Sequence, residues 1–132
     1  MNKTRVLAVD DDQTVLDIIK QGLETLDYEV DTAESEADVW ISLHRTRPDI
    51  ILMDVSMPGL DGISLCKNIR TSPGMSDIPI IMLTAFSDEK TFHDAMLFGA
   101  TDFLMKPFEI SEVQKKIEDC LSKTSSQKGT GK

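Results

Sequence analysis

Carboxylate, hydroxyl and amine side chains follow four apolar segments of this sequence, each directly after its segment ends. They belong to Asp10, Asp11, Asp12, Asp54, Thr84 and Lys106. Adjacent carboxylates repel one another unless a cation neutralises them, and oxygen-rich acidic clusters favour a hard divalent cation such as Mg²⁺. An aspartate in such a cluster can attack phosphorus to form an acyl phosphate, while a lysine and a hydroxyl can bind phosphoryl oxygens. These residue types therefore indicate metal-assisted phosphoryl chemistry, provided that the fold brings them together.

Each of these residues has a simpler explanation when it is taken alone. Asp54 could cap a turn, because aspartate is a common turn residue. Asp10 and Asp11 could be acids at a helix N-terminus, where the helix dipole favours negative charge. Thr84 could be an ordinary hydroxyl at a strand end, and Lys106 could be a surface lysine. The occurrence of all of them at successive strand ends favours one shared site.

The elements that must position these residues alternate along the chain. Apolar runs predict strands at residues 6–9, 28–30, 50–53, 78–83 and 102–105, and helical spacing predicts helices at 14–26, 35–45, 62–70, 88–98 and 110–121. Asp12 and Ser35 are expected N-caps, and Gly99 is an expected C-cap. Five βα units in succession predict an α/β domain with a parallel sheet covered by helices on both faces. Because ligands bind beyond the carboxyl ends of such strands, the polar residues should gather at one edge of the sheet.

Length and composition limit the possible classes of protein. The chain has 132 residues, of which 40% are hydrophobic, and a formal net charge of −9. These values fit a single soluble domain, and the negative charge argues against a general affinity for nucleic acid. Cys66 and Cys120 are expected to be reduced thiols. We find no apolar stretch long enough for a signal peptide or a membrane span, so we expect no membrane partner and a cytoplasmic protein.

The C-terminal residues differ in composition from the rest of the chain. We expect one domain over residues 1–122, followed by a polar segment at 123–132 that ends in "TSSQKGTGK". The Gly/Ser-rich composition of this segment is typical of a disordered tail, or of a linker before an output domain.

Four segments together resemble the receiver domain of two-component response regulators. They are "VLAVDDD", "PDIILMDVSMPGLDG", "IPIIMLTA" and "GATDFLMKPF", and the resemblance covers residues 4–122. It implies a flavodoxin-like (βα)5 doubly wound sheet with strand order 2-1-3-4-5. It also implies a phosphorylation-activated switch that accepts a phosphoryl group from a histidine kinase or a phosphotransfer protein. The implied cofactor is Mg²⁺, with Mn²⁺ as a possible substitute.

The resemblance also implies a role for each residue of the site. Asp54 would be the phosphoacceptor, and the metal would be held by Asp10, Asp11, Asp54 and the backbone carbonyl of Ser56. The residues that bind the phosphoryl group and act in the switch would be Thr84, Ala85, Lys106 and the aromatic Phe103. The residues that tune loss of the phosphate would be Ser56 and Phe86. The peptide bond before Pro107 is a candidate cis bond.

The resemblance further implies how the signal leaves the domain. Phosphorylation would move Thr84 and turn Phe103 inward, which would change a surface formed by the fourth helix, the fifth strand and the fifth helix, over residues 88–121. A downstream protein or an output domain would dock there, and a homodimer is possible. The domain would catalyse only its own phosphorylation and dephosphorylation. We expect a long-lived phosphorylated form, because the Phe86 ring has no polar atom to orient an attacking water.

Other functions remain alternatives on the sequence alone. A phosphatase with an aspartyl intermediate would need a second acid two residues after the nucleophile, where this chain has Ser56. A flavin or nucleotide carrier would need a phosphate-binding loop rich in Gly, Ser or Thr after the first strand, where this chain has three aspartates. A degenerate receiver that signals without phosphate would lack a key residue, and none is missing here.

Overall fold

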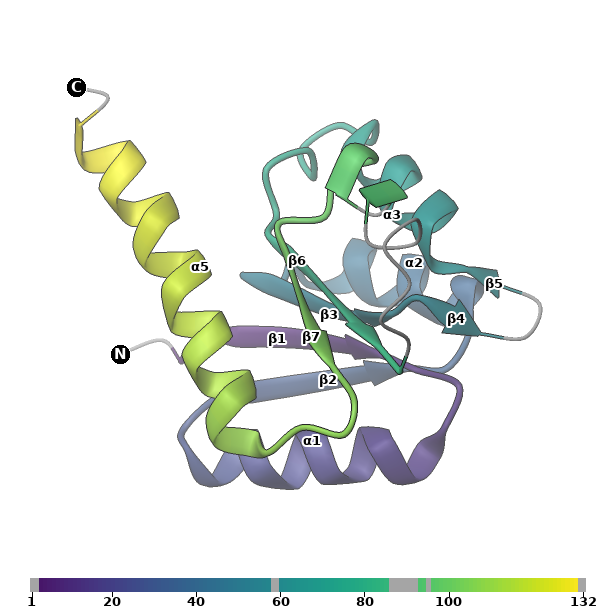
Figure 1. Cartoon of the computed structure of the whole chain (residues 1–132). Coiled ribbons are helices and arrows are strands. Elements are labelled where there is room, and N and C mark those ends of the chain that lie inside the picture. The colour runs from purple at the N-terminus through teal and green to yellow at the C-terminus, as the bar shows by residue number, and fades with distance from the viewer. Residues whose placement is uncertain (1–2, 58–59, 86–92, 95, 131–132) are drawn as a thin grey trace.

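The computed structural model describes residues 3–57, 60–85, 93–94 and 96–130 of the chain. The strands are β1 (Arg5–Val9), β2 (Glu29–Ala33), β3 (Ile50–Asp54), β4 (Ser56–Met57), β5 (Leu60–Asp61), β6 (Ile80–Thr84) and β7 (Asp102–Met105). The labelled helices are α1 (Gln13–Thr25), α2 (Glu36–Arg45), α3 (Gly62–Arg70) and α5 (Ile110–Thr130). These elements form a layered α/β domain (Figure 1).

The main sheet has five parallel strands in the order β2-β1-β3-β6-β7. Counted along the main sheet alone, this is the order 2-1-3-4-5, so the predicted doubly wound flavodoxin-like fold is confirmed. The three central strands are buried along most of their length, as parallel strands covered on both faces should be. The predicted fourth strand differs in detail, because β6 begins at Ile80, directly after Pro79, which has no N–H for a ladder.

Alternate residues of the strands enter two separate cores. On one face, Leu7, Ile51, Met53 and Ile80 pack in a cluster with residues of α2 and α3. On the other face, Val6, Ile50, Leu52 and Ile81 pack in a cluster with residues of α1 and α5. The period of two along each strand therefore gives both helical layers an apolar surface to cover.

The helix ends follow the predicted capping chemistry. The Asp12 carboxylate accepts a hydrogen bond from the Thr14 backbone N–H at the start of α1, and the Ser35 hydroxyl accepts one from the Asp38 N–H at the start of α2. Gly99 has a φ of 113°, a left-handed conformation that favours glycine. Most of the helix predicted at residues 88–98 lies outside the described residues, although residues 93–94 and 96–97 are helical.

The last helix is longer than the sequence predicts. α5 extends to Thr130, whereas we expected residues 123–132 to be a disordered tail or a linker. Residues 123–128 contain neither proline nor glycine, so nothing in them interrupts the backbone hydrogen bonds of a helix. The projecting end of α5 is visible in Figure 1. The division into a domain at 1–122 and a separate tail stays a prediction.

Among the helices of the described residues, none has the length and apolar character that a bilayer crossing requires.

Candidate functional site

The register of the sheet brings four strand ends to one edge. Val9 of β1 lies opposite Met53 of β3, so Asp10 and Asp54 follow at the same level. β3 pairs with β6, and the Lys106 N–H donates to the Thr84 carbonyl oxygen at 2.6 Å beside the ends of β6 and β7. Residues that are far apart in the sequence therefore meet at the carboxyl edge, as predicted.

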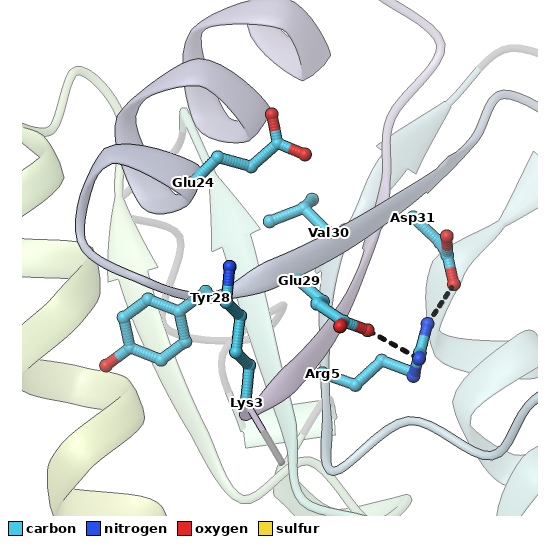
Figure 2. Close-up of a pocket in the computed structure, with 7 residues that line it drawn as sticks. All are labelled: Lys3, Arg5, Glu24, Tyr28, Glu29, Val30 and Asp31. Atoms are coloured by element: carbon cyan, nitrogen blue, oxygen red, sulfur yellow. Dashed lines mark hydrogen bonds and ion pairs between the residues drawn. The ribbon is translucent and has the colours of Figure 1, made fainter. Parts of the chain in front are cut away.

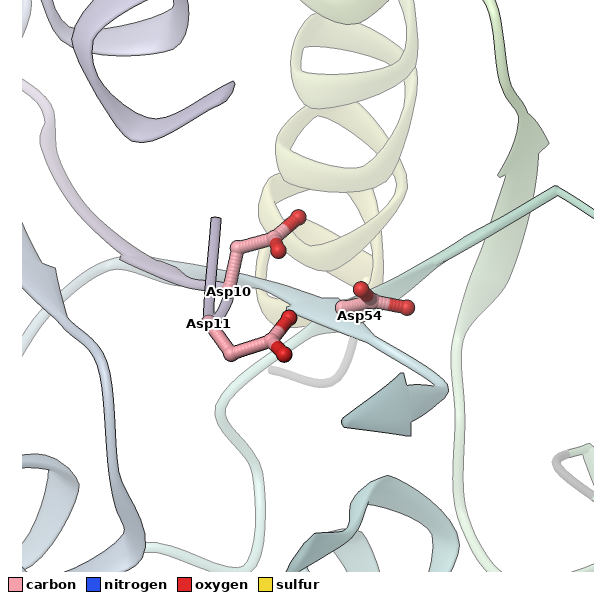
Figure 3. A group of neighbouring side chains, drawn as sticks. All are labelled: Asp10, Asp11 and Asp54. Carbon is pink, nitrogen blue, oxygen red and sulfur yellow. The ribbon is translucent and has the colours of Figure 1, made fainter. Parts of the chain in front are cut away.

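Three carboxylates converge at this edge. Asp10 and Asp11 leave β1, Asp54 ends β3, and Figure 3 shows their side chains directed toward a common space. Each residue offers an oxygen, and these oxygens lie within 4.8 Å of one another. Asp10 and Asp54 are buried, whereas Asp11 is exposed. Because the three oxygens are so close, their mutual repulsion favours a cation between them.

The backbone after β1 fixes the orientation of Asp10. Its Oδ1 accepts a hydrogen bond from the Asp12 N–H at 2.9 Å, in the turn that leads into α1. Its Oδ2 accepts a bond from Lys106 Nζ, also at 2.9 Å. Asp12 itself caps α1 and lies outside the cluster. Of the three consecutive aspartates, two therefore serve the site and one serves the helix.

Lys106 connects two of the carboxylates. Its Nζ lies 2.9 Å from Asp10 Oδ2 and 3.2 Å from Asp54 Oδ2. Burial alone would lower the pKa of Lys106, but the hydrogen bond with Asp10 and the charges of Asp54 and Asp10 outweigh burial and raise the pKa above its ordinary value. The amine is therefore protonated at neutral pH. One ammonium offsets only one of three carboxylates, so the donor set fits a hard divalent cation with oxygen ligands.

The chain after Asp54 forms a hairpin that the sequence analysis did not predict. Ser56 and Met57 of β4 pair with Leu60 and Asp61 of β5 in antiparallel orientation. α3 begins at the next residue, and the Gly62 N–H donates to the Val55 carbonyl at 3.2 Å. The hairpin and α3 therefore follow closely on Asp54, the last residue of β3.

Gly62 is a residue of this region that sequence reasoning missed. A Cβ atom at this position would lie 2.5 Å from the Asp54 carbonyl oxygen, so a larger residue would push the start of α3 away from Asp54. The available signal was a glycine directly after the capping residue Asp61, at the first position of the helix. Glycine there allows close approach of two backbone segments.

The other predicted residues that the structure describes lie on β6 and β7 or directly after them. Thr84 is buried at the end of β6, and Ala85 follows it in an exposed position. Phe103 lies half-buried on β7, packed against the core cluster of α2 and α3. The Lys106–Pro107 peptide bond is cis. Phe86 lies outside the described residues.

A hollow lies at the opposite ends of the strands, away from the acidic edge. It has a volume of about 300 Å³ and is lined by residues of β1, β2 and α1, which Figure 2 shows. Its charged groups form ion pairs with one another or with neighbours outside the lining: Arg5 pairs with Glu29 and Asp31, Lys3 with Asp27, and Glu24 with Lys20. These three bases and four acids leave one negative charge uncompensated, whereas Lys106 leaves two of the three carboxylates at the carboxyl edge uncompensated.

Comparisons with known proteins point to one protein family. A family model described as "Response regulator receiver domain" matches residues 6–118. The chain is 36% identical over 123 residues to the "Probable transcriptional regulator ycf27" of Guillardia theta, covering 93% of this chain and 47% of that protein. It is 35% identical over 120 residues to "Response regulator MprA" of Mycobacterium leprae, covering 91% of this chain and 52% of that protein. The chain thus spans about half the length of these curated relatives.

The fold gives the same result. The structure of the chemotaxis protein CheY4 of Vibrio cholerae superposes with a TM-score of 0.86 at 29% identity, covering 90% of this chain and 99% of that one. The matched residues 6–118 include all five strands of the main sheet except Arg5, together with every residue of the acidic edge. Because model, relatives and fold agree over that span, the chain belongs to the response regulator receiver domain family.

Proposed function

We propose that Asp54 accepts a phosphoryl group and that the resulting acyl phosphate is the signal of this receiver domain. The observation that carries the proposal is the convergence of Asp10, Asp11 and Asp54 within 4.8 Å, with the Lys106 ammonium 3.2 Å from Asp54 Oδ2. An oxygen of the Asp54 carboxylate attacks phosphorus, and the bond between phosphorus and the donor's leaving group breaks. With acetyl phosphate as donor, the leaving group is acetate.

The residues around Asp54 suit the charge that develops during the transfer. Asp10, Asp11, Asp54 and the Ser56 backbone carbonyl would hold Mg²⁺, or Mn²⁺ in its place. A divalent ion there would offset the charge of the carboxylates and of the phosphoryl oxygens. Lys106 donates to a phosphoryl oxygen, and the Thr84 hydroxyl and the backbone at Ala85 bind the other oxygens. The protein catalyses only the phosphorylation and dephosphorylation of its own Asp54. It is therefore a regulator and not an enzyme that converts a separate substrate.

The phosphorylated site changes a surface through β7. Thr84 ends β6, and Met105 lies opposite it on β7, one residue before Lys106 and two after Phe103. When Thr84 moves toward the phosphoryl oxygens, Phe103 turns inward against the core cluster that it already contacts. Helical residues 96–97, β7 and α5 then present a different face to a downstream target, which is a separate protein, an output domain or a second copy of the chain.

The donor and the lifetime of the phosphate are further parts of the proposal. A histidine kinase or a histidine phosphotransfer protein supplies the phosphoryl group. Ser56 and Phe86 set the rate of hydrolysis, and the apolar ring of Phe86 makes it slow. Phe86→Glu is expected to accelerate dephosphorylation, measured as decay of the phosphorylated mass after the donor is removed. An unchanged rate would remove Phe86 from the hydrolytic step.

Intact mass after incubation with acetyl phosphate tests the main proposal. We expect the wild-type chain to gain one phosphoryl group in Mg²⁺ and to gain none when the metal is chelated. Asp54→Asn should gain none under either condition. Asp12→Asn is the matched control, because Asp12 caps α1 outside the cluster and asparagine is an equally good N-cap; this variant should be labelled like the wild type. A folded wild type that gains no mass, or an Asp54→Asn variant that still gains it, would overturn the proposal.

A further inference from the structure

α3 connects the acidic edge to the segment before β7. At its first residue, the Gly62 N–H donates to the Val55 carbonyl at 3.2 Å, directly after Asp54. At its last residue, Arg70 donates from Nε to the Gly99 carbonyl at 2.9 Å. The helix has 9 residues and so spans roughly 13 Å between these contacts. A helix of this length is a rigid element, so a shift of the backbone at Val55 can be transmitted to residues 98–101.

Arg70 binds main-chain and hydroxyl oxygens rather than a carboxylate. Its Nη1 donates to the carbonyls of Ser76 and Ile78, and its Nη2 lies 3.4 Å from Thr101 Oγ1. No ion pair of Arg70 occurs within the described part of the chain. Burial lowers the pKa of this guanidinium, although nearby Cys66 and Asp77 partly offset the effect. A half-buried arginine whose donors are all directed at two loops acts as a connector between those loops.

Two neighbours on the same helix contact the same segment. The Cys66 thiol donates to the Phe98 carbonyl at 3.6 Å, and Lys67 Nζ lies 5.5 Å from the centre of the Phe98 ring. Gly99 leaves space for this arrangement, because a Cβ atom there would lie 2.7 Å from Arg70 Cγ. The C-terminal half of α3 therefore holds residues 98–101 through three side chains of different chemistry.

Residues 98–101 in turn control the entry into β7. The Thr101 N–H donates to the Ile80 carbonyl at 2.7 Å, and Thr101 Oγ1 accepts a bond from the Ile80 N–H at 3.0 Å. The next residue, Asp102, begins the strand that carries Phe103. On the other side lie Leu97 and Phe98, which are 67% and 38% exposed. Residues 98–101 thus join an exposed apolar surface to the strand of the switch aromatic.

We propose that Arg70 is a positioning residue that couples the state of Asp54, through α3, to the surface formed by residues 96–98. This inference rests on the proposed phosphorylation of Asp54. Arg70 touches neither the acidic cluster nor the phosphoryl group. Its guanidinium holds residues 98–101 against the end of α3, so that they follow the helix when the backbone at Val55 moves. Without this connection, phosphorylation would still occur, but residues 96–101 would not respond to it.

Amide hydrogen exchange over residues 96–104, followed by mass spectrometry with and without acetyl phosphate and Mg²⁺, tests the inference. The variants are Arg70→Gln and Arg70→Lys. The matched control is Arg47→Gln, because Arg47 also donates to a carbonyl, that of Gly74 at 3.0 Å, and pairs with Asp77 at 2.6 Å, without contacting residues 98–101. Intact mass measured on the same samples gives the phosphorylated fraction.

In the wild type and in Arg47→Gln, phosphorylation should change the exchange rates over residues 96–104 severalfold. In Arg70→Gln, these exchange rates should be roughly tenfold faster before phosphorylation, because a charged hydrogen-bond donor to part-buried carbonyls is lost. Phosphorylation should then leave the rates unchanged. The phosphorylated fraction should stay within about twofold of the wild type. Arg70→Lys keeps the charge but not the planar fork, so it should restore part of the response.

The experiment distinguishes failure of the proposed phosphorylation from failure of the proposed role of Arg70. A wild type that gains no phosphoryl mass contradicts the proposed function, and with it the coupling. Normal phosphorylation together with a wild-type exchange response in Arg70→Gln overturns the role of Arg70 alone. If Arg70→Gln does not fold by circular dichroism, Arg70→Lys decides: a full wild-type response in that variant overturns the inference, and a weakened response supports it.

Discussion

At the scale of single residues, charge imbalance is the main property of this site. Lys106 contacts Asp10 and Asp54 through its ammonium group, whereas Asp11 belongs to the same cluster without an ion pair among the described residues. Asp11 is therefore the residue whose negative charge is least compensated when no metal is bound. Its repulsion with Asp10 and Asp54 lowers the free energy of unfolding under those conditions.

Asp11→Asn should stabilise the metal-free protein and weaken its response to Mg²⁺. Removing one exposed charge from the cluster is expected to raise the free energy of unfolding by about 0.5–1 kcal/mol in chelator, as measured by urea denaturation at low salt. The stabilisation that Mg²⁺ gives to the wild type should be smaller in the variant, because one ligand is neutral. Asp12→Asn is the control and should change neither value. Destabilisation of the metal-free Asp11→Asn protein would show that repulsion does not dominate the cluster.

The reactivity of the Cys66 thiol tests whether this side chain is buried. Burial raises the pKa of its thiol above the ordinary value, with a smaller opposite effect from Arg70. The raised pKa leaves less thiolate at a given pH, and the thiolate is the reactive form. We expect alkylation of Cys66 at pH 8 to be roughly a hundredfold slower in the folded protein than in concentrated urea. Peptide mass spectrometry separates Cys66 from Cys120, and equal rates in the two conditions would contradict the buried position.

At the scale of elements, close packing determines how α1 and α5 lie against one another. α1 and α5 cover the same face of the sheet, and both contribute to one core cluster (Figure 1). The two helices come close together at Gly22, where a Cβ atom would lie 2.5 Å from Ile110 Cγ1 and 2.7 Å from Ile110 Cδ1. Glycine costs α1 some intrinsic helix stability, but it allows the first residue of α5 to pack directly against α1.

Gly22→Ala should destabilise the protein, although alanine is the better helix former. The propensity gain of about 1 kcal/mol is outweighed by overpacking, which costs about 1–3 kcal/mol. We expect a net loss of about 1 kcal/mol in urea denaturation. In an Ile110→Ala background the crowding is removed, so the same substitution should become stabilising by about 0.5–1 kcal/mol. The same sign in both backgrounds would mean that Ile110 is not the residue that Gly22 accommodates.

At the scale of the whole molecule, stability comes from two apolar layers on either side of one sheet. The buried residues of α5 in the described core are Val113, Ile117 and Cys120. All three lie in the first half of a helix that continues to Thr130. Residues 123–132 have the sequence KTSSQKGTGK, which contains no apolar side chain that could add to this core.

Removing residues 123–132 should leave the stability of the domain almost unchanged. We expect a chain that ends at Ser122 to unfold in urea within about 0.5 kcal/mol of the full chain, because buried apolar contacts supply most of the free energy of folding. The helical circular dichroism signal should fall with the loss of the last turns. A loss of more than about 1 kcal/mol would mean that the domain boundary at residue 122 is wrong.

The sequence by itself determined the order and type of the five strands of the main sheet and of α1, α2 and α3, and it placed the polar residues at the strand ends. Both follow from local patterns. A period of two or of 3.6 residues shows which side chains are buried, and a polar residue after an apolar run marks a strand end. Asp54 and Thr84, which end β3 and β6, could therefore be assigned to one edge of a parallel sheet from the sequence alone. The resemblance to receiver domains added the strand order, which the sheet confirms.

Only the tertiary structure decided which of these groups touch. Lys106 Nζ reaches Asp10, 96 residues away in the sequence, because strand register and side-chain direction place both groups in the same space. Three other contacts were also visible only in the folded structure. They are the pairing of β4 with β5, the close contact of Gly22 with Ile110, and the hydrogen bonds from Arg70 to Gly99 and Thr101. Local patterns specify which face of an element is buried but not the partner that covers it. Distances of a few ångströms between distant residues are fixed only when all the layers pack together.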